Sequence, residues 1–149
     1  MTTLLWAVVY FGTFFIMEFV AWFSHKYIMH GFVWVWHKDH HKKEHDSWFE
    51  RNDLFFVVYA LMSFVFVVLW NDYGYWAGLP IALGIFTYGC TYFVVHDIFI
   101  HQRFKWLKRT NNRYAKGLRR AHKIHHKNIH KNGGECFGML VVPRKYFRN

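Results

Sequence analysis

Proline, cysteine and acidic residues are scarce in this chain, and each shortage excludes a class of protein. Among 149 residues there are two prolines, ten glycines and two cysteines. So few prolines and glycines exclude a collagen-like or low-complexity chain. The cysteines are too few for a disulfide framework, and Cys90 lies in an apolar run whereas Cys136 lies in a polar tail. We therefore predict two free thiols that face a reducing compartment.

Apolar and aromatic side chains are abundant instead. Hydrophobic residues make up 54% of the chain and aromatic residues 23%. This composition excludes a disordered chain. A soluble domain of this length would also lack a core large enough to bury so many rings. The length allows one domain at most, so residues 1–149 are expected to form a single membrane-embedded unit.

Three long apolar stretches predict an all-α integral membrane protein. They cover about residues 2–23, 54–70 and 75–100, and each is long enough to cross a hydrocarbon core as a helix. The third has too few residues for two full spans, so we read it as one long or tilted helix. A broken helix that adds a fourth, partial crossing is the alternative.

The basic residues predict the orientation of these spans. Lys and Arg are absent from residues 1–24 and 71–77, whereas residues 25–53 carry five and residues 101–149 carry fourteen. With three spans, every basic residue falls on one side of the membrane. The positive-inside rule makes that side the cytoplasm and puts the N-terminus outside. The basic residues behind the net charge of +10 are therefore distributed according to the spans, and they form no nucleic-acid-binding motif. Anionic lipid headgroups or an acidic soluble partner would account for it.

Histidines form an internal repeat. Each half of the chain reads HxxxxH and then HKxHHK, which selects ten of the twelve histidines. The members of the repeat are His25, His30, His37, His40 and His41 in the first half, and His96, His101, His122, His125 and His126 in the second. His45 and His130 fall outside it and are expected to be solvated or to hydrogen-bond one of the metal-ligating residues.

The spacing of the repeat predicts that its imidazoles converge. In HxxHH, three rings lie within about 100° of one another on an α-helix. The two rings of HxxxxH are about 140° apart, so they would serve two metals or lie at a helix end where the geometry loosens. Each HxxxxH ends an apolar stretch. All four clusters should therefore meet at the cytoplasmic face of the membrane.

Ten clustered histidines predict a two-metal site. Neutral imidazole suits Fe, Zn, Cu and Ni, and ten rings are too many for one ion of coordination four to six. A structural zinc site would use fewer ligands, usually with cysteine, although zinc can replace iron in a purified protein. No catalytic residues are predicted beyond the ligands. Glu18, Asp39 and Asp97 are candidates to orient ligand rings, with ion pairs or helix pairing as their alternatives.

At these motifs the chain resembles the membrane-bound di-iron hydroxylases of the fatty-acid hydroxylase and sterol desaturase superfamily, and within it the bacterial β-carotene hydroxylases. The matching blocks cover nearly the whole chain. They are EFVAWFSHKYIMHGFVWVWHKDHH, FERNDLFFVVYA, YGCTYFVVHDIFIHQRF, RRAHKIHHK and ECFGML. The histidine pattern alone is typical of the superfamily. The combination of HKYIMHG, FERND and YFVVHDIFIHQR is typical of the carotene hydroxylases.

The resemblance implies 3-hydroxylation of the two β-ionone rings of β-carotene, through β-cryptoxanthin to zeaxanthin. It also implies two Fe ions, O₂, and electrons from reduced ferredoxin, for which the basic residues after His101 are a candidate docking face. The substrate would enter from the bilayer. Tunnel candidates are Phe11, Phe15, Phe19, Trp22, Phe86, Tyr88, Gly89 and Tyr92.

Other functions remain open on the sequence. A carotenoid ketolase, a sterol oxidase or a fatty-acid hydroxylase would use the same site on another lipid. A membrane metal transporter would need polar residues inside the spans, and apart from Glu18 and Asp97 these are apolar. A purely structural membrane protein would leave the repeated histidines unexplained.

Overall fold

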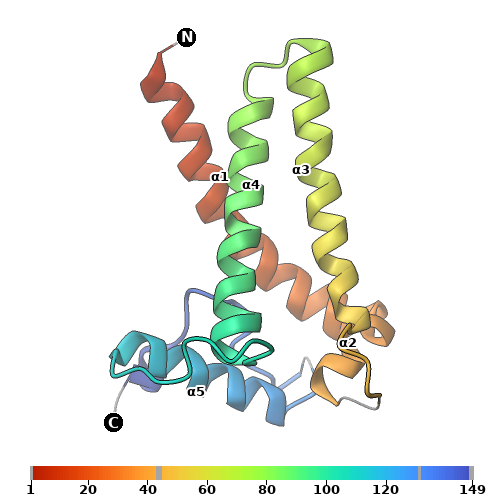
Figure 1. Cartoon of the computed structure of the whole chain (residues 1–149), viewed down its shortest axis with the longest axis vertical. Helices are drawn as coiled ribbons and strands as arrows, with labels where there is room; N and C mark the ends of the chain where they lie inside the picture. Colours follow the sequence, from red (N-terminus) through yellow and green to blue (C-terminus); the bar gives the residue numbers. More distant parts are fainter. Residues whose placement is uncertain (1, 43–44, 131, 148–149) are drawn as a thin grey trace.

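The computed structural model describes residues 2–42, 45–130 and 132–147, and among these it contains helices and loops but no strand (Figure 1). Three helical stretches are long and apolar enough to cross a membrane: Thr3–Phe32, Arg51–Tyr73 and Gly78–Ile100. The prediction of an all-helical membrane protein is confirmed. Within the described residues there is no fourth helix of this kind, and the first stretch continues nine residues beyond its predicted end.

The first and third of these stretches each change from an α-helix to a π-helix just before a histidine of the repeat. The first consists of α1 (Thr3–Phe23) and the π-helical segment η1 (Ser24–Phe32), and the third of α4 (Gly78–Phe93) and the π-helical segment η3 (Val94–Ile100). The second consists of a short 3₁₀ turn, η2 (Arg51–Asp53), followed by α3 (Leu54–Tyr73). π-helical turns are rare and occur often at functional sites.

α4 is the central helix and packs closely against both α1 and α3. A Cβ atom added to Gly84 would lie 2.7 Å from the Cβ of Thr13 on α1, and one added to Gly78 would lie 2.5 Å from the carbonyl oxygen of Phe66 on α3. Small residues allow such backbone approach, which is how helices associate in a bilayer that offers no hydrophobic driving force between them. The Tyr10 hydroxyl also donates to Thr87, which ties α1 to α4.

A tight turn joins α3 to α4. Gly74 ends α3 with φ +66°, the left-handed conformation that a residue without a side chain adopts at little cost. The N–H groups of Gly74 and Tyr75 both donate to the carbonyl of Leu69, so that the end of the helix is satisfied. The predicted third span therefore begins at Gly78 rather than at Tyr75.

Two helices lie at the foot of the spans, where α1 and α4 end (Figure 1). They are α2 (Trp34–His41) and α5 (Arg113–Lys127). The Asn112 side chain caps α5 by accepting a hydrogen bond from the N–H of Ala115. Behind α5, the ring of Phe147 in the 3₁₀ segment η4 (Arg144–Phe147) fills the space left by Gly117. This arrangement turns the histidines of α5 toward α2 and the ends of the spans.

Candidate metal centre

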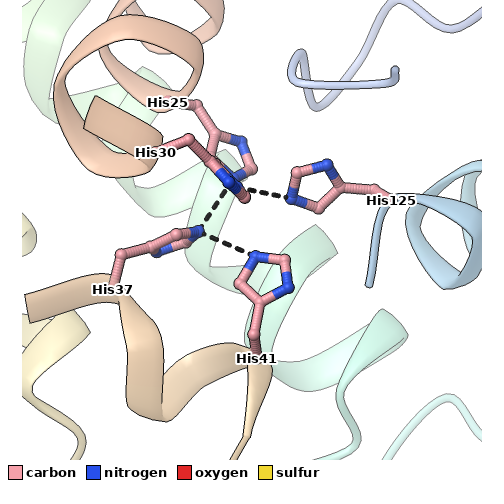
Figure 2. Close-up of side chains that lie close together, drawn as sticks. All are labelled: His25, His30, His37, His41 and His125. Atoms are coloured by element: carbon pink, nitrogen blue, oxygen red, sulfur yellow. Dashed lines mark hydrogen bonds between the residues drawn. The ribbon is translucent and has the colours of Figure 1, made fainter. Parts of the chain in front are cut away.

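Nine imidazoles come together in two groups beneath the spans. Within each group, the nitrogens that could bind a metal all lie within 4.8 Å of one another. Group one consists of His25, His30, His37, His41 and His125 (Figure 2), and group two of His40, His101, His122 and His126. The ring of His96 lies beside group two, with its centroid 4.5 Å from that of His101. The geometry thus brings together all ten histidines of the repeat.

The two halves of the repeat interleave. Each HxxHH sends its first and last rings to one group and its middle ring to the other, so His40 of α2 joins group two and His125 of α5 joins group one. The reason is helical geometry. Residues i and i+4 are about 40° apart, whereas i+3 projects about 100° away from i+4. The sequence predicts three rings on one face, and the structure divides that face between two groups.

π-helical geometry explains how both rings of the first HxxxxH reach one group. η1 is π-helical from Ser24 until Gly31, where the backbone leaves helical geometry, and after η3 the N–H of His101 donates to the carbonyl of His96. In a π-helix such i→i+5 hydrogen bonds bring each residue close to the residue five positions before it. His25 and His30 therefore share group one, with ring centroids 5.1 Å apart. The alternative that they serve different metals does not fit this geometry.

Outward hydrogen bonds fix the tautomers of four of the five rings in group one, whereas the buried Nδ1 of His41 has no hydrogen-bond partner within the described residues. A carbonyl only accepts, so each Nδ1 that contacts one must carry the proton. These bonds run from His25 to Phe137 (2.9 Å), from His30 to Ile129 (2.9 Å) and from His125 to Glu135 (3.2 Å). The Nδ1 of His37 likewise donates to the Asn52 side chain, at 2.6 Å. In a neutral ring this leaves Nε2 as a bare lone pair that faces the middle of the group.

The converging lone pairs fit a cation. The Nε2 atoms of His25 and His37 are 3.0 Å apart, and those of His30 and His125 are 3.2 Å apart (Figure 2). With both Nδ1 protons donated outward, neither member of such a pair has a proton to share. Two nitrogens bound at right angles to one metal, each about 2.1 Å from it, would be about 3.0 Å apart. In group two the buried Nε2 of His40 has no hydrogen-bond partner within the described residues. Both groups therefore fit a metal ion.

Burial keeps these rings neutral. It lowers the pKa of His37, His40 and His122 well below the usual value, because desolvation penalises the charged form and the neighbouring imidazoles add to the effect. For the same reason the pKa of His125 falls to about 3 and that of His126 to about 4. A neutral imidazole is the form that binds a metal, so at neutral pH no proton has to be displaced.

A second layer of polar residues supports group two. The Nδ1 of His40 lies 3.0 Å from Glu50, and the Nδ1 of His96 lies 3.1 Å from Asp97. Asp97 in turn accepts a 2.8 Å hydrogen bond from Arg103. The contact of Asp97 with His96 agrees with the predicted orienting role. Glu50, Asn52 and Arg103 had no spacing signal in the sequence, because they meet their side-chain partners across turns of the chain, at separations that range from 6 to 50 residues.

Glu18 and Asp39 have other partners than the predicted imidazoles. Glu18 accepts a 2.7 Å hydrogen bond from Tyr88 on α4, which agrees with the alternative of helix pairing, and three more from backbone N–H groups near the C-terminus. Asp39 accepts from the N–H of Arg51 and contacts the Nε2 of His45. His45 and His130 belong to neither group.

An apolar cavity of about 510 Å³ lies between α1, α3 and α4. It reaches the histidines through Asn52, which bonds His37, and through Tyr92, whose ring centroid is 4.9 Å from that of His96. Four of the predicted tunnel residues line it: Phe86, Tyr88, Gly89 and Tyr92. The four on α1 do not line it. Phe15, Phe19 and Trp22 line a second pocket instead, against residues 136–138 and 141–144, and Phe11 is more than half exposed.

These features define an integral membrane protein with a buried, metal-type histidine centre below an apolar cavity. Comparison with known proteins agrees, because the family model "Fatty acid hydroxylase" matches residues 10–142. The chain belongs to this family of membrane-bound hydroxylases and is a metal-dependent oxygenase.

Several curated proteins are similar over most of the chain. "Beta-carotene hydroxylase" of Pantoea ananas is 40% identical over 92% of this chain and 77% of its own length. "Beta-carotene hydroxylase" of Paracoccus sp. is 39% identical over 89% of this chain and 81% of its own length. The chloroplastic "Beta-carotene hydroxylase 2" of Capsicum annuum is 32% identical over 87% of this chain and 42% of its own length. No solved structure matches this one significantly.

Proposed function

We propose that this protein hydroxylates carbon 3 of each β-ionone ring of β-carotene and so forms β-cryptoxanthin and then zeaxanthin. The observation that carries the proposal is the apolar cavity that ends at Asn52 and Tyr92, both in contact with histidines of the repeat. The 40% identity to a curated β-carotene hydroxylase supports the choice of substrate.

The ten histidines of the repeat are proposed to hold two Fe ions, five rings to each. His96 completes group two, because it occupies the place in the second half that His25 occupies in the first, and its ring lies against those of His40, His101 and His122. When bound, iron supplies the activation of O₂ that an unactivated ring C–H bond requires. The chain orients six of the ten rings through their Nδ1 atoms, and burial keeps the rings of α2 and α5 neutral. Phe137, only 3% exposed and packed against three rings of group one, excludes water from them.

The walls of the cavity suit a hydrocarbon. Three of its four hydroxyl groups are already engaged: Tyr59 donates to Ser24, Ser63 to the carbonyl of Ala82, and Tyr88 to Glu18. A polar substrate would therefore find few partners, whereas β-carotene needs none. One end of the β-carotene molecule would lie near Tyr92 and Asn52. About one side chain would then separate that end from the histidines.

Electrons are proposed to come from a ferredoxin that docks on α5. The inner face of this helix carries His122 and His125, and its outer face exposes four basic residues at intervals of four, three and four. They are Lys116, Arg120, Lys123 and Lys127. Such a face attracts an acidic protein close to the centre. From the same charge distribution we propose that this side of the protein faces the cytoplasm and that the N-terminus lies outside.

The test is a pigment profile. We expect a bacterial host that accumulates β-carotene, supplied with iron and a working ferredoxin, to convert it to zeaxanthin when it expresses this chain. Chromatography with mass detection should show a gain of one oxygen and then two. Unchanged β-carotene beside correctly inserted protein would contradict the substrate assignment, and a keto product would indicate a ketolase.

Filling the cavity should block this conversion. A Cβ atom added to Gly89 meets nothing within 4 Å, and Gly89 lines the cavity, so the side chain of Gly89→Leu would occupy the substrate's space. We expect zeaxanthin formation to fall about 10-fold to 100-fold, because small displacements of a substrate cost that much, while bound iron is unchanged. Gly12→Leu is the matched control: the space around Gly12 on α1 is also open, but the residue lies outside the cavity. Equal activity of both variants would argue against this cavity as the substrate site.

A further inference from the structure

Glu18 is a carboxylate within the first membrane span whose hydrogen bonds lead away from the histidines. Its Oε1 accepts from three consecutive backbone N–H groups, those of Met139, Leu140 and Val141, at 2.9, 2.9 and 3.0 Å. Its Oε2 accepts from Tyr88 on α4. A carboxylate at membrane depth is costly unless it is fully bonded, and so is irregular backbone. Here the Glu18 carboxylate and the N–H groups of the irregular backbone satisfy one another's hydrogen bonds.

The segment that Glu18 holds is also the segment that orients group one. Residues 135–141, which we name the C-terminal strap, supply the carbonyl of Phe137 to His25 and that of Glu135 to His125. On its other side the strap is bonded to α5, because the Tyr114 hydroxyl donates to the carbonyl of Leu140. The outward bonds beside group two go elsewhere: the Nδ1 of His40 donates to Glu50 and that of His96 to Asp97.

We propose that Glu18 is a positioning residue for group one, acting through the C-terminal strap: it fixes the two carbonyls that hold His25 and His125 in the tautomer with a free Nε2. Outer hydrogen bonds of this kind orient a ligand ring and raise its basicity, and their loss typically lowers metal affinity 10-fold to 100-fold. The inference rests on the proposed metal binding but not on the proposed substrate. It predicts that the two metals respond differently to a change at Glu18.

Close packing at Gly138 gives a second way to disturb the same contact. A Cβ atom added to this glycine would lie 2.8 Å from the Oε1 of Glu18 and 3.3 Å from the carbonyl oxygen of Val141. Gly138→Ala should therefore displace the carboxylate from the three N–H groups without removing it. In Glu18→Ala the obstacle is gone, so adding Gly138→Ala should have little further effect.

The experiment is a metal titration of the full chain in lipid nanodiscs. Wild-type and variant proteins are stripped with a chelator and titrated with Fe²⁺ under anaerobic conditions, and bound iron is measured by equilibrium dialysis. We expect two tight equivalents for wild type. For Glu18→Ala and Gly138→Ala we expect one equivalent to stay tight and the other to weaken at least about 10-fold. Glu18→Gln, which keeps an acceptor oxygen for the strap, should restore part of the loss.

Tyr10→Phe is the matched control. It removes another hydrogen bond between α1 and α4 but does not touch the strap, and it should bind iron like wild type. Equal weakening of both equivalents in Glu18→Ala and Gly138→Ala would mean general loosening and would overturn the proposal, as would unchanged binding. A wild type that binds no Fe²⁺ would instead contradict the proposed metal centre. If Glu18→Ala fails to fold, Gly138→Ala decides alone.

Discussion

Replacing His37 by alanine is expected to reduce zeaxanthin formation to below about 1% of wild type, a larger loss than the removal of an outer hydrogen bond causes. The ring is 2% exposed, and its Nε2 lies 3.0 Å from that of His25 and 3.1 Å from that of His41. Its loss therefore takes away one nitrogen of group one and opens a space beside two more. Fe²⁺ binding should fall from two equivalents to one, because the nitrogens of group two are untouched.

His130→Ala is the control for this prediction, since the residue is exposed and belongs to neither group. It should keep more than half of the wild-type activity and both metal equivalents. Pigment analysis in the β-carotene host measures the first quantity, and the dialysis measurement gives the second. Wild-type zeaxanthin levels in the His37→Ala strain would show that group one is not needed for the reaction.

Replacing Arg103 by methionine is expected to destabilise the protein by about 3–5 kcal/mol. The guanidinium bonds Asp53, Asp97 and the carbonyl of Trp48, and it lies 4.6 Å from the centroid of the Trp48 ring. These hydrogen bonds raise the pKa of Arg103, that to Asp53 most strongly, so the cation is permanent. Without it the carboxylate of Asp97, whose side chain is 3% exposed, would be buried without a counter-charge and would keep its contact with the Nδ1 of His96. Thermal unfolding in nanodiscs should shift down by roughly 6–20 °C.

Two further variants separate geometry from charge at this position. Arg103→Lys keeps the charge but cannot form the planar, forked contacts, so an intermediate loss is expected. The exposed Arg109 offers a matched control, and Arg109→Met should change stability by less than about 0.5 kcal/mol. If Arg103→Met were as stable as Arg109→Met, the ion-pair network would have no structural role.

The sequence was sufficient to predict the three spans and the convergence of the ten histidines. Both rest on periodic patterns of side chains, which a helix translates directly into space. It was not sufficient for the geometry of HxxxxH. The estimate of 140° between His25 and His30 assumed an α-helix, whereas η1 is π-helical and brings the rings together. A change of helix type carries no signal in a pattern read at 3.6 residues per turn.

The tail beyond Gly134 was the other gap. It contains few residues with recognisable chemistry, yet it orients His25 and His125 through the carbonyls of Phe137 and Glu135. Every residue has a carbonyl, so such contacts depend on the path of the chain and cannot be predicted from residue types. The partners of Glu18 could not be predicted from the sequence either, because three of them are backbone N–H groups, which almost every residue has.

The position of the cavity has a kinetic consequence. Its wall includes Phe86 and Val94, which are 58% and 43% exposed on the sides of the spans, so the opening faces the hydrocarbon of the bilayer. The concentration that governs turnover is then the mole fraction of carotene in the surrounding lipid, and encounters occur by diffusion in two dimensions. Inert phospholipid added to the same membrane dilutes the substrate and slows the enzyme, whereas a larger volume of buffer changes nothing.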